Sequence, residues 1–142
     1  MKVVIITGGF DPLHSGHIAY INEAKKLGDI LIVGANSDEW LVRKKGKYFL
    51  PLTERKIILQ SIKNVDVVID FNDEDNSAKN AIEVVREMYP SDKIIFANGG
   101  DRTKTNIPEM DVDDNNIEFV FGVGGIDKKN SSSWILNRWN NC

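Results

Sequence analysis

The strongest structural signal in this 142-residue chain is the stretch Gly8-Gly9-Phe10-Asp11-Pro12-Leu13-His14-Ser15-Gly16-His17. An apolar, β-branched run at 3–6 precedes it, and residues with helical periodicity follow it. A strand, a tight glycine turn and a helix start, in this order, is where α/β proteins place nucleotide phosphates. His14 and His17 are three residues apart, so we expect both side chains on one face near the start of the helix. The stretch therefore predicts an anion site made of two imidazoles and unpaired backbone N–H groups.

The composition is that of a soluble globular domain. Hydrophobic residues make up 42% of the chain and charged residues 27%, with a formal net charge of -3. Binding to nucleic acid or to a membrane surface relies on clustered positive charge, so we expect neither as a partner. A membrane-spanning helix needs about 20 apolar residues, and the apolar runs here are far shorter. Because the one cysteine, Cys142, has no partner for an internal disulfide, we expect a cytoplasmic protein.

Apolar periodicity predicts strands that alternate with helices along the chain. We expect strands at 2–7, 30–35, 65–69, 93–97 and 117–121, and helices at about 18–27, 53–62, 78–88 and 134–139. This alternation predicts the α/β class: a Rossmann-like, doubly wound, mainly parallel five-stranded sheet with helices on both faces, in a single domain 1–142. Thr53 is the expected N-cap of the second helix, and the segment before it, which contains the basic stretch 43–47, is expected to be a mobile loop.

Two further segments are candidates for the ligand side of this sheet. Residues 98–102 form a second glycine turn at the carboxyl end of a strand, where open parallel sheets bind ligands. Residues 131–133 are three serines at the start of the last predicted helix, where hydroxyls and free N–H groups bind phosphates. A simple turn and a soluble helix cap are the structural alternatives for these two segments.

The stretch 8–17 resembles the Gly-x-Phe-Asp-x-x-His-x-Gly-His signature of the cytidylyltransferase-like nucleotidyltransferases, with every motif position present. These enzymes join a nucleoside triphosphate to a phosphorylated acceptor and release pyrophosphate. The resemblance extends to residues 27–29, 36–38 and 99–101, to Arg55 and to the serine run. Within the family, the chain is most similar to the glycerol-3-phosphate cytidylyltransferases and to the nucleotidyltransferase domain of ADP-heptose synthases.

The resemblance implies a role for each motif residue. It implies that His14 and His17 contact the triphosphate and stabilise the transition state, with Lys44 and Asp11 as further catalytic residues. Asp11 would also hold Mg²⁺, the one cofactor expected. The residues implied in nucleotide binding are Gly8, Gly9, Phe10, Gly16, Gly99, Asp101, Arg102, Ser131, Ser132 and Ser133. Those implied in acceptor binding are Asp38, Lys47 and Arg55.

Structural roles stay open for several of these residues. Asp11 could only form the turn, the basic stretch could be a solvated loop, and Arg55 could pair with a surface acid. The serine run also departs from the family pattern, because many members place a lysine or arginine directly after the hydroxyls, where this chain has Trp134. Lys128, Lys129 or Arg138 would then supply the missing charge.

The leading functional hypothesis is transfer of a nucleotidyl group, with cytidylyl as first choice, from an NTP to a small phosphorylated alcohol or sugar. Transfer from ATP is second, because Gly99-Gly100-Asp101 resembles the turn of ADP-heptose synthases; adenylyltransferases that make coenzyme precursors share the Asp11-Pro12 pair. A nucleotide-binding module without turnover, or a metallohydrolase with His14, His17 and Asp11 as ligands, are the alternatives from other classes. The family resemblance also implies a homodimer.

Overall fold

A computed structural model of the chain describes residues 1–99, 107–112, 114–124 and 132–140. Within these residues, five parallel strands form one sheet in the order β3-β2-β1-β4-β5. The strands are β1 (Lys2–Gly8), β2 (Ile30–Ala35), β3 (Val67–Ile69), β4 (Lys93–Gly99) and β5 (Ile117–Val123). The order reverses between β1 and β4, so the predicted doubly wound, Rossmann-like sheet is confirmed. In such sheets the ligand crevice lies beyond the carboxyl ends of the strands at this reversal.

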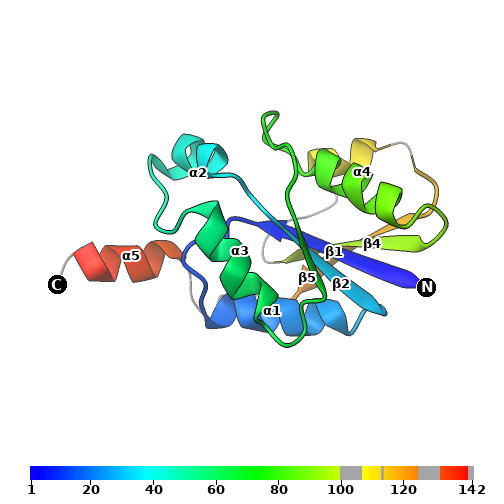
Figure 1. The fold of residues 1–142 in the computed structure, drawn as a ribbon, viewed down its shortest axis with the longest axis horizontal. Helices are drawn as coiled ribbons and strands as arrows, with labels where there is room; N and C mark the ends of the chain where they lie inside the picture. Colours follow the sequence, from blue (N-terminus) through cyan, green and yellow to red (C-terminus); the bar gives the residue numbers. More distant parts are fainter. Residues whose placement is uncertain (100–106, 113, 125–131, 141–142) are drawn as a thin grey trace.

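Helices cover both faces of the sheet (Figure 1). The helical segments are α1 (Ser15–Lys25), α2 (Asp38–Lys45), α3 (Leu52–Gln60), α4 (Lys79–Met88), the 3₁₀ turn η1 (Pro108–Asp111) and α5 (Ser132–Asn140). Figure 1 shows α1 and α3 on one face and α4 on the other, with α2 and α5 near the carboxyl ends of the strands. None of the helices in the described part of the chain has the length and hydropathy needed to cross a bilayer.

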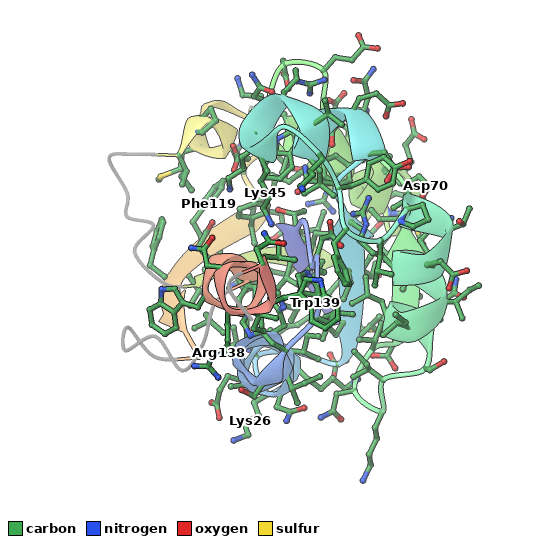
Figure 2. All side chains as sticks on the ribbon, turned by 90° about the vertical axis from the view of Figure 1, so that its left-hand side faces the viewer. Lys26, Lys45, Asp70, Phe119, Arg138 and Trp139 are labelled. Carbon is green, nitrogen blue, oxygen red and sulfur yellow. The ribbon has the colours of Figure 1, made fainter. Side chains whose placement is uncertain are left out.

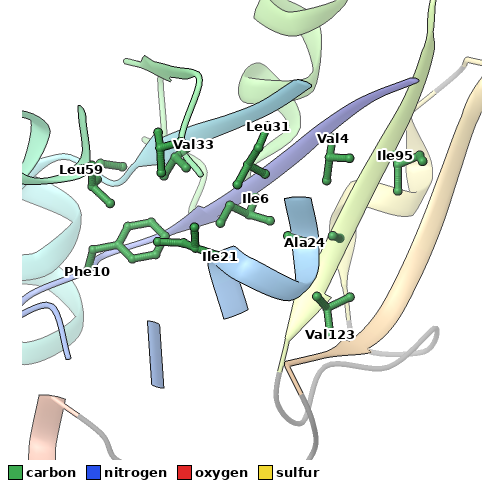
Figure 3. Packing of buried hydrophobic residues seen from close by; sticks show 13 residues of the cluster. Val4, Ile6, Phe10, Ile21, Ala24, Leu31, Val33, Leu59, Ile95 and Val123 are labelled. Atoms are coloured by element: carbon green, nitrogen blue, oxygen red, sulfur yellow. The ribbon is translucent and has the colours of Figure 1, made fainter. Parts of the chain in front are cut away.

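The side chains of strand β1 belong to two hydrophobic layers, because successive side chains point to opposite faces of the sheet. Val4 and Ile6 pack with α1 and α3 (Figure 3), whereas Val3 and Ile5 pack with α4. All four side chains are fully buried. The continuous apolar run of β1 is therefore the pattern of a central strand covered on both sides.

The prediction of a mobile loop before the second predicted helix is wrong, because residues 38–45 of this segment form α2. Ser37 caps this helix by accepting a hydrogen bond from the Trp40 N–H, and Gly46 ends it in the left-handed conformation (φ 88°). Acidic residues occupy its first turn and basic residues its last, which suits the helix dipole. Periodicity could not indicate α2, since Leu41 is its one buried side chain.

The predicted cap of α3 is also wrong. The helix begins at Leu52, one residue before Thr53, with Pro51 at the N-cap position and no side-chain cap from it. Instead, the carboxylate of Asp38 accepts the Leu52 N–H at 2.8 Å. The start of α3 is therefore capped from α2, across 14 residues of sequence.

Candidate active site

His14 and His17 cap the amino end of α1 with their own imidazoles. Nδ1 of His14, the N-cap residue, accepts the Gly16 N–H at 3.0 Å, and Nδ1 of His17 accepts the His14 N–H at 3.3 Å. The arrangement is a capping box in which two imidazoles replace the usual hydroxyl and carboxylate. It holds the ring centroids 4.0 Å apart with an interplanar angle of 32°.

These hydrogen bonds fix the protonation of both rings. Because each Nδ1 is an acceptor, a neutral ring carries its proton on Nε2. Burial, the adjacent His14 and the charge of Lys45 lower the pKa of His17 to about 4. Burial and Lys45 also lower the pKa of His14. At neutral pH the pair therefore presents two Nε2–H donors beside the unpaired N–H groups of α1, an arrangement that can bind phosphate oxygens.

Gly8, Gly9 and Phe10 support the histidines and α2. The Phe10 ring is buried and meets the His17 ring edge to face, with centroids 5.1 Å apart. A Cβ on Gly8 would lie 3.3 Å from the Phe10 ring. A Cβ on Gly9 would lie 2.9 Å from Cδ2 of Leu41, so α2 packs directly on the glycine turn. The glycines thus allow close internal packing at this edge of the sheet.

Asp11 is committed to the backbone of the segment between α2 and α3. Its side chain is buried, with Oδ2 accepting the Phe49 N–H at 2.6 Å and Oδ1 accepting the Leu50 N–H at 2.7 Å. Each carboxylate oxygen thus accepts one backbone N–H, which agrees with the turn-forming role left open for Asp11. No group of three or more potential metal ligands occurs among the described residues.

Lys45 is the basic residue that the structure brings to the histidines. Its Nζ donates to the Asp11 carbonyl at 3.0 Å, and its charge lowers the pKa of both imidazoles. Lys44, the expected catalytic lysine, instead lies with Nζ 4.6 Å from the centroid of the Trp40 ring. Lys47 is exposed beyond the end of the helix. Sequence reasoning missed Lys45 because it assumed a loop; on a helix, Lys45 lies one turn after Leu41 and shares its face toward the glycine turn.

Arg55 forms a buried polar centre and pairs there with the partly exposed Asp38. The Arg55 side chain is fully buried and donates to the carbonyls of Leu50, Gly9 and Asn36 at 2.9, 2.9 and 2.6 Å. It also pairs with the Asp38 carboxylate at 2.7 Å. Arg55 therefore ties the glycine turn, the end of β2 and the start of α3 into one unit.

The second half of the expected site is described in part. A Cβ on Gly99 would lie 3.1 Å from the ring of Tyr20, whose hydroxyl donates to the Ala97 carbonyl, so this glycine admits α1 against the sheet. Ser132 Oγ donates to the Pro12 carbonyl at 2.9 Å, which joins the start of α5 to the glycine turn. The other candidates lie outside the described residues: Asp101, Arg102, Lys128, Lys129, Ser131 and the side chain of Ser133.

The structure thus brings His14 and His17, at the start of α1, together with Lys45, at the end of α2. Figure 2 shows Lys45 at the end of the molecule where α2 and α5 lie. Paired imidazoles, a helix amino terminus and a lysine are groups suited to binding anions. The family described as cytidylyltransferase-like matches residues 5–127 of the chain. The chain belongs to this family of nucleotidyltransferases, and the expected family and fold are confirmed.

Two curated relatives and one solved structure are similar to this chain. Bifunctional protein HldE of Erwinia tasmaniensis is 36% identical over 137 residues, covering 87% of this chain and 28% of the relative. Bifunctional protein HldE of Nitratiruptor sp. is 32% identical and covers 99% of this chain and 28% of the relative. The crystal structure of a lipopolysaccharide core biosynthesis protein from Thermoplasma volcanium superposes with a TM-score of 0.63 at 30% identity, covering 85% of this chain and 95% of that one. The chain spans about a quarter of the length of these two curated relatives.

Proposed function

We propose that this domain transfers the adenylyl group of ATP to the phosphate of a small phosphorylated sugar. An oxygen of the acceptor phosphate attacks the α-phosphorus, the bond between that phosphorus and the bridging oxygen to the β-phosphate breaks, and pyrophosphate leaves. The observation that carries the proposal is the pair of Nε2–H donors on His14 and His17 at the start of α1. The similarity to HldE proteins and to a lipopolysaccharide core biosynthesis protein supports a sugar phosphate as acceptor.

The chemistry needs positioned positive charge more than it needs a base. Charge builds up on the oxygens around phosphorus and on the departing pyrophosphate, so donors fixed in advance lower the barrier. The two neutral imidazoles donate hydrogen bonds through Nε2 and need not lose a proton to do so. The N–H groups of α1 are further hydrogen-bond donors. Lys45 supplies a full positive charge beside the imidazoles, and its ammonium donates to the Asp11 carbonyl.

A divalent metal is general in nucleotidyltransferases of this family, and it would neutralise charge on the triphosphate. We propose that Mg²⁺ enters with the nucleotide, since both oxygens of Asp11 bind backbone amides. A homodimer and a cytoplasmic location stay proposals as well. The exposed Trp134 and Trp139 of α5 are the large apolar side chains that favour a subunit contact.

CTP is the second candidate for the nucleotide. The family description favours it, whereas the HldE relatives and the resemblance of Gly99-Gly100-Asp101 to the ADP-heptose synthase turn favour ATP. Selection between adenine and cytosine depends on segments other than the phosphate site. The proposed roles of His14 and His17 are therefore the same for ATP and for CTP.

Pyrophosphate release tests the proposal. The protein is incubated with Mg²⁺, each of the four nucleoside triphosphates and a panel of sugar phosphates together with glycerol 3-phosphate. We expect release with ATP and at least one sugar phosphate, and release with CTP and glycerol 3-phosphate alone would favour the second candidate. The matched variant is His17→Gln, because glutamine at this position of a capping box retains an acceptor for the His14 N–H while removing the imidazole.

Two results would contradict the proposal. One is the absence of release for every pair of substrates. The other is release that is unchanged in His17→Gln. If no pair gives release and calorimetry shows that nucleotide binding survives His17→Gln, the chain is a binding module without turnover.

A further inference from the structure

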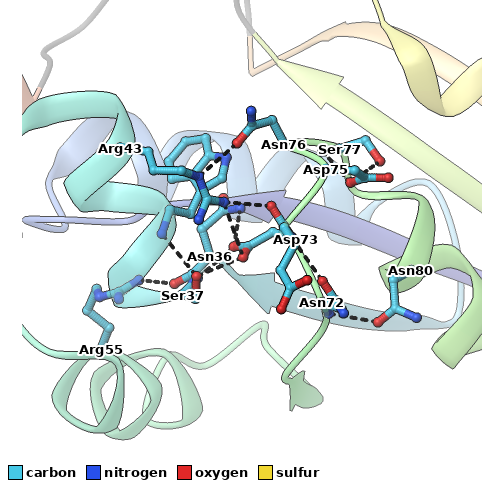
Figure 4. A network of polar contacts seen from close by, with 12 residues as sticks. Asn36, Ser37, Arg43, Arg55, Asn72, Asp73, Asp75, Asn76, Ser77 and Asn80 are labelled. Carbon is cyan, nitrogen blue, oxygen red and sulfur yellow. Dashed lines mark hydrogen bonds and ion pairs between the residues drawn. The ribbon is translucent and has the colours of Figure 1, made fainter.

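Helix α2 carries Lys45, the lysine that lies beside the two histidines, yet few apolar contacts hold the helix in place. Leu41 is its one buried side chain, and the helix from Asp38 to Lys45 has eight residues. A helix of about two turns is unstable alone, so its position depends on contacts at its ends. Asp38 and Lys45 contact Arg55 and Asp11, as described above, and the segment after β3 supplies a further set of contacts at both ends (Figure 4).

Asp73 holds the amino end of α2. Its buried carboxylate accepts the Ser37 hydroxyl at 2.7 Å, the Ser37 N–H at 2.8 Å and the Asn36 side-chain amide at 3.1 Å. The Ser37 hydroxyl donates its one proton to Asp73, so its lone pairs are left to accept the Trp40 N–H at 3.1 Å. Asp73 therefore orients the cap of α2 and places a negative charge at the positive end of the helix.

The same segment holds the carboxyl end of α2 through Arg43. The guanidinium donates to the Asp73 carbonyl at 2.8 Å and to the side-chain oxygen of Asn76 at 3.1 Å. It also lies 3.9 Å from the Asp73 carboxylate. We call Asp73 and Asn76, with their partners Ser37 and Arg43, the α2 clasp. The α2 clasp therefore holds the helix in place by hydrogen bonds at its cap and at its last turn.

We propose that Asp73 is a positioning residue for nucleotidyl transfer, acting through α2 on Lys45. The inference rests on the proposed function. The Asp73 side chain is 4% exposed and its carboxylate is occupied by α2 and its cap, so it acts without touching a substrate. A shift of α2 moves the Lys45 ammonium away from the Asp11 carbonyl and from the imidazoles. Misplacement by about 1 Å can cost up to about 100-fold in rate.

The test compares Asp73→Asn with Asp75→Asn. Asp73→Asn replaces one carboxylate oxygen, an acceptor of hydrogen bonds from Asn36 and Ser37, with an NH₂ group that can only donate. The second variant makes the same charge change in the same segment, where Asp75 bonds to the N–H and hydroxyl of Ser77 and has no contact with α2 among its hydrogen bonds. We expect kcat/KM for pyrophosphate release to fall at least about tenfold in Asp73→Asn. It should change less than about twofold in Asp75→Asn.

A double-variant comparison separates positioning from loss of stability. When Lys45 is replaced by alanine, adding Asp73→Asn should change kcat/KM by less than about twofold, because its effect acts through Lys45. The fall in melting temperature should be the same in both backgrounds. An equal loss of kcat/KM with and without Lys45 would overturn the proposal.

A titration decides the same question without turnover. Because Lys45 lowers the pKa of His17, displacement of α2 should raise the His17 pKa measured by NMR in Asp73→Asn and leave it unchanged in Asp75→Asn. An unchanged His17 pKa in Asp73→Asn overturns the inference. If wild-type protein releases no pyrophosphate with any substrate pair, the proposed function fails, while the titration still decides whether Asp73 places Lys45.

Discussion

Nδ1 of His17 accepts a hydrogen bond from the backbone N–H of His14 at 3.3 Å, with the two rings 4.0 Å apart. Each imidazole therefore caps the helix with Nδ1, and the donor role proposed for the site falls to Nε2. The predictions below follow from this division of roles and from the contacts around it.

The first prediction concerns pH. His17 has a folded-state pKa of about 4, below its unfolded value of about 6.5, so the unfolded chain binds more protons between these values. The stability that the neutral ring contributes is complete above about pH 6.5 and is lost as the pH falls toward 4. NMR should show both histidines as Nε2–H tautomers at pH 7, with His17 titrating near pH 4. A His17 pKa at or above 6.5 would contradict the geometry.

The second prediction separates the two adjacent lysines. Lys45→Gln should raise the pKa of both His14 and His17, because it removes a positive charge that opposes their protonation. Lys44→Gln should leave both values near those of the wild type, since Lys44 lies over Trp40. Lys45→Gln should also lower kcat/KM by more than Lys44→Gln does. Titration by NMR and pyrophosphate release measure the two effects, and a larger effect from Lys44 would reverse the assignment.

The third prediction concerns the buried guanidinium. Arg55→Met leaves the carbonyls of Gly9, Leu50 and Asn36 and the Asp38 carboxylate without their shared donor. Removing one member of a buried ion pair costs about 3–5 kcal/mol, and urea unfolding should show a loss of this size.

The control for Arg55 is the neighbouring Lys56→Met. Lys56 pairs with Asp70 at the surface, at 3.0 Å, and a surface pair contributes about 1 kcal/mol or less. Equal stability losses in the two variants would show that Arg55 is not the centre of a buried network.

The fourth prediction concerns the contact between the glycine turn and α2. Gly9→Ala places a Cβ 2.9 Å from Cδ2 of Leu41, an overlap that should destabilise the protein by about 1–3 kcal/mol. Leu41→Ala removes the opposing atoms, so the double variant should be more stable than the sum of the two single losses indicates. Thermal unfolding of the four proteins measures this coupling, and strict additivity would contradict direct packing.

The sequence predicted the sheet well because its strands are continuous apolar runs. The start of β1, the full extent of β2 and the glycine turn were all indicated by local patterns, and a parallel order followed from the alternation of elements. β3 is shorter than predicted: it begins at Val67, and Asp66 before it accepts the Leu31 N–H through its carboxylate at 2.8 Å. Such a contact, 35 residues apart in sequence, leaves no local signal.

The site was predicted less completely, for a physical reason. Motif residues can be found in a sequence, but which partners satisfy a buried donor depends on the fold. Asp11, Asp38 and Arg55 were all interpreted as facing ligands, whereas their hydrogen bonds are made within the protein. Lys45 could have been distinguished from Lys44 if Ser37 and Gly46 had been combined as the two ends of a helix.

Arg55 makes all of its hydrogen bonds to residues between Gly9 and Arg55 itself, in the first half of the chain. The donors and acceptors of this interlock therefore all precede β3 in the chain. The second half of the chain joins it through Asp73, which accepts the Asn36 side-chain amide, through the pairing of β4 with β1, and through the contact of Ser132 with Pro12.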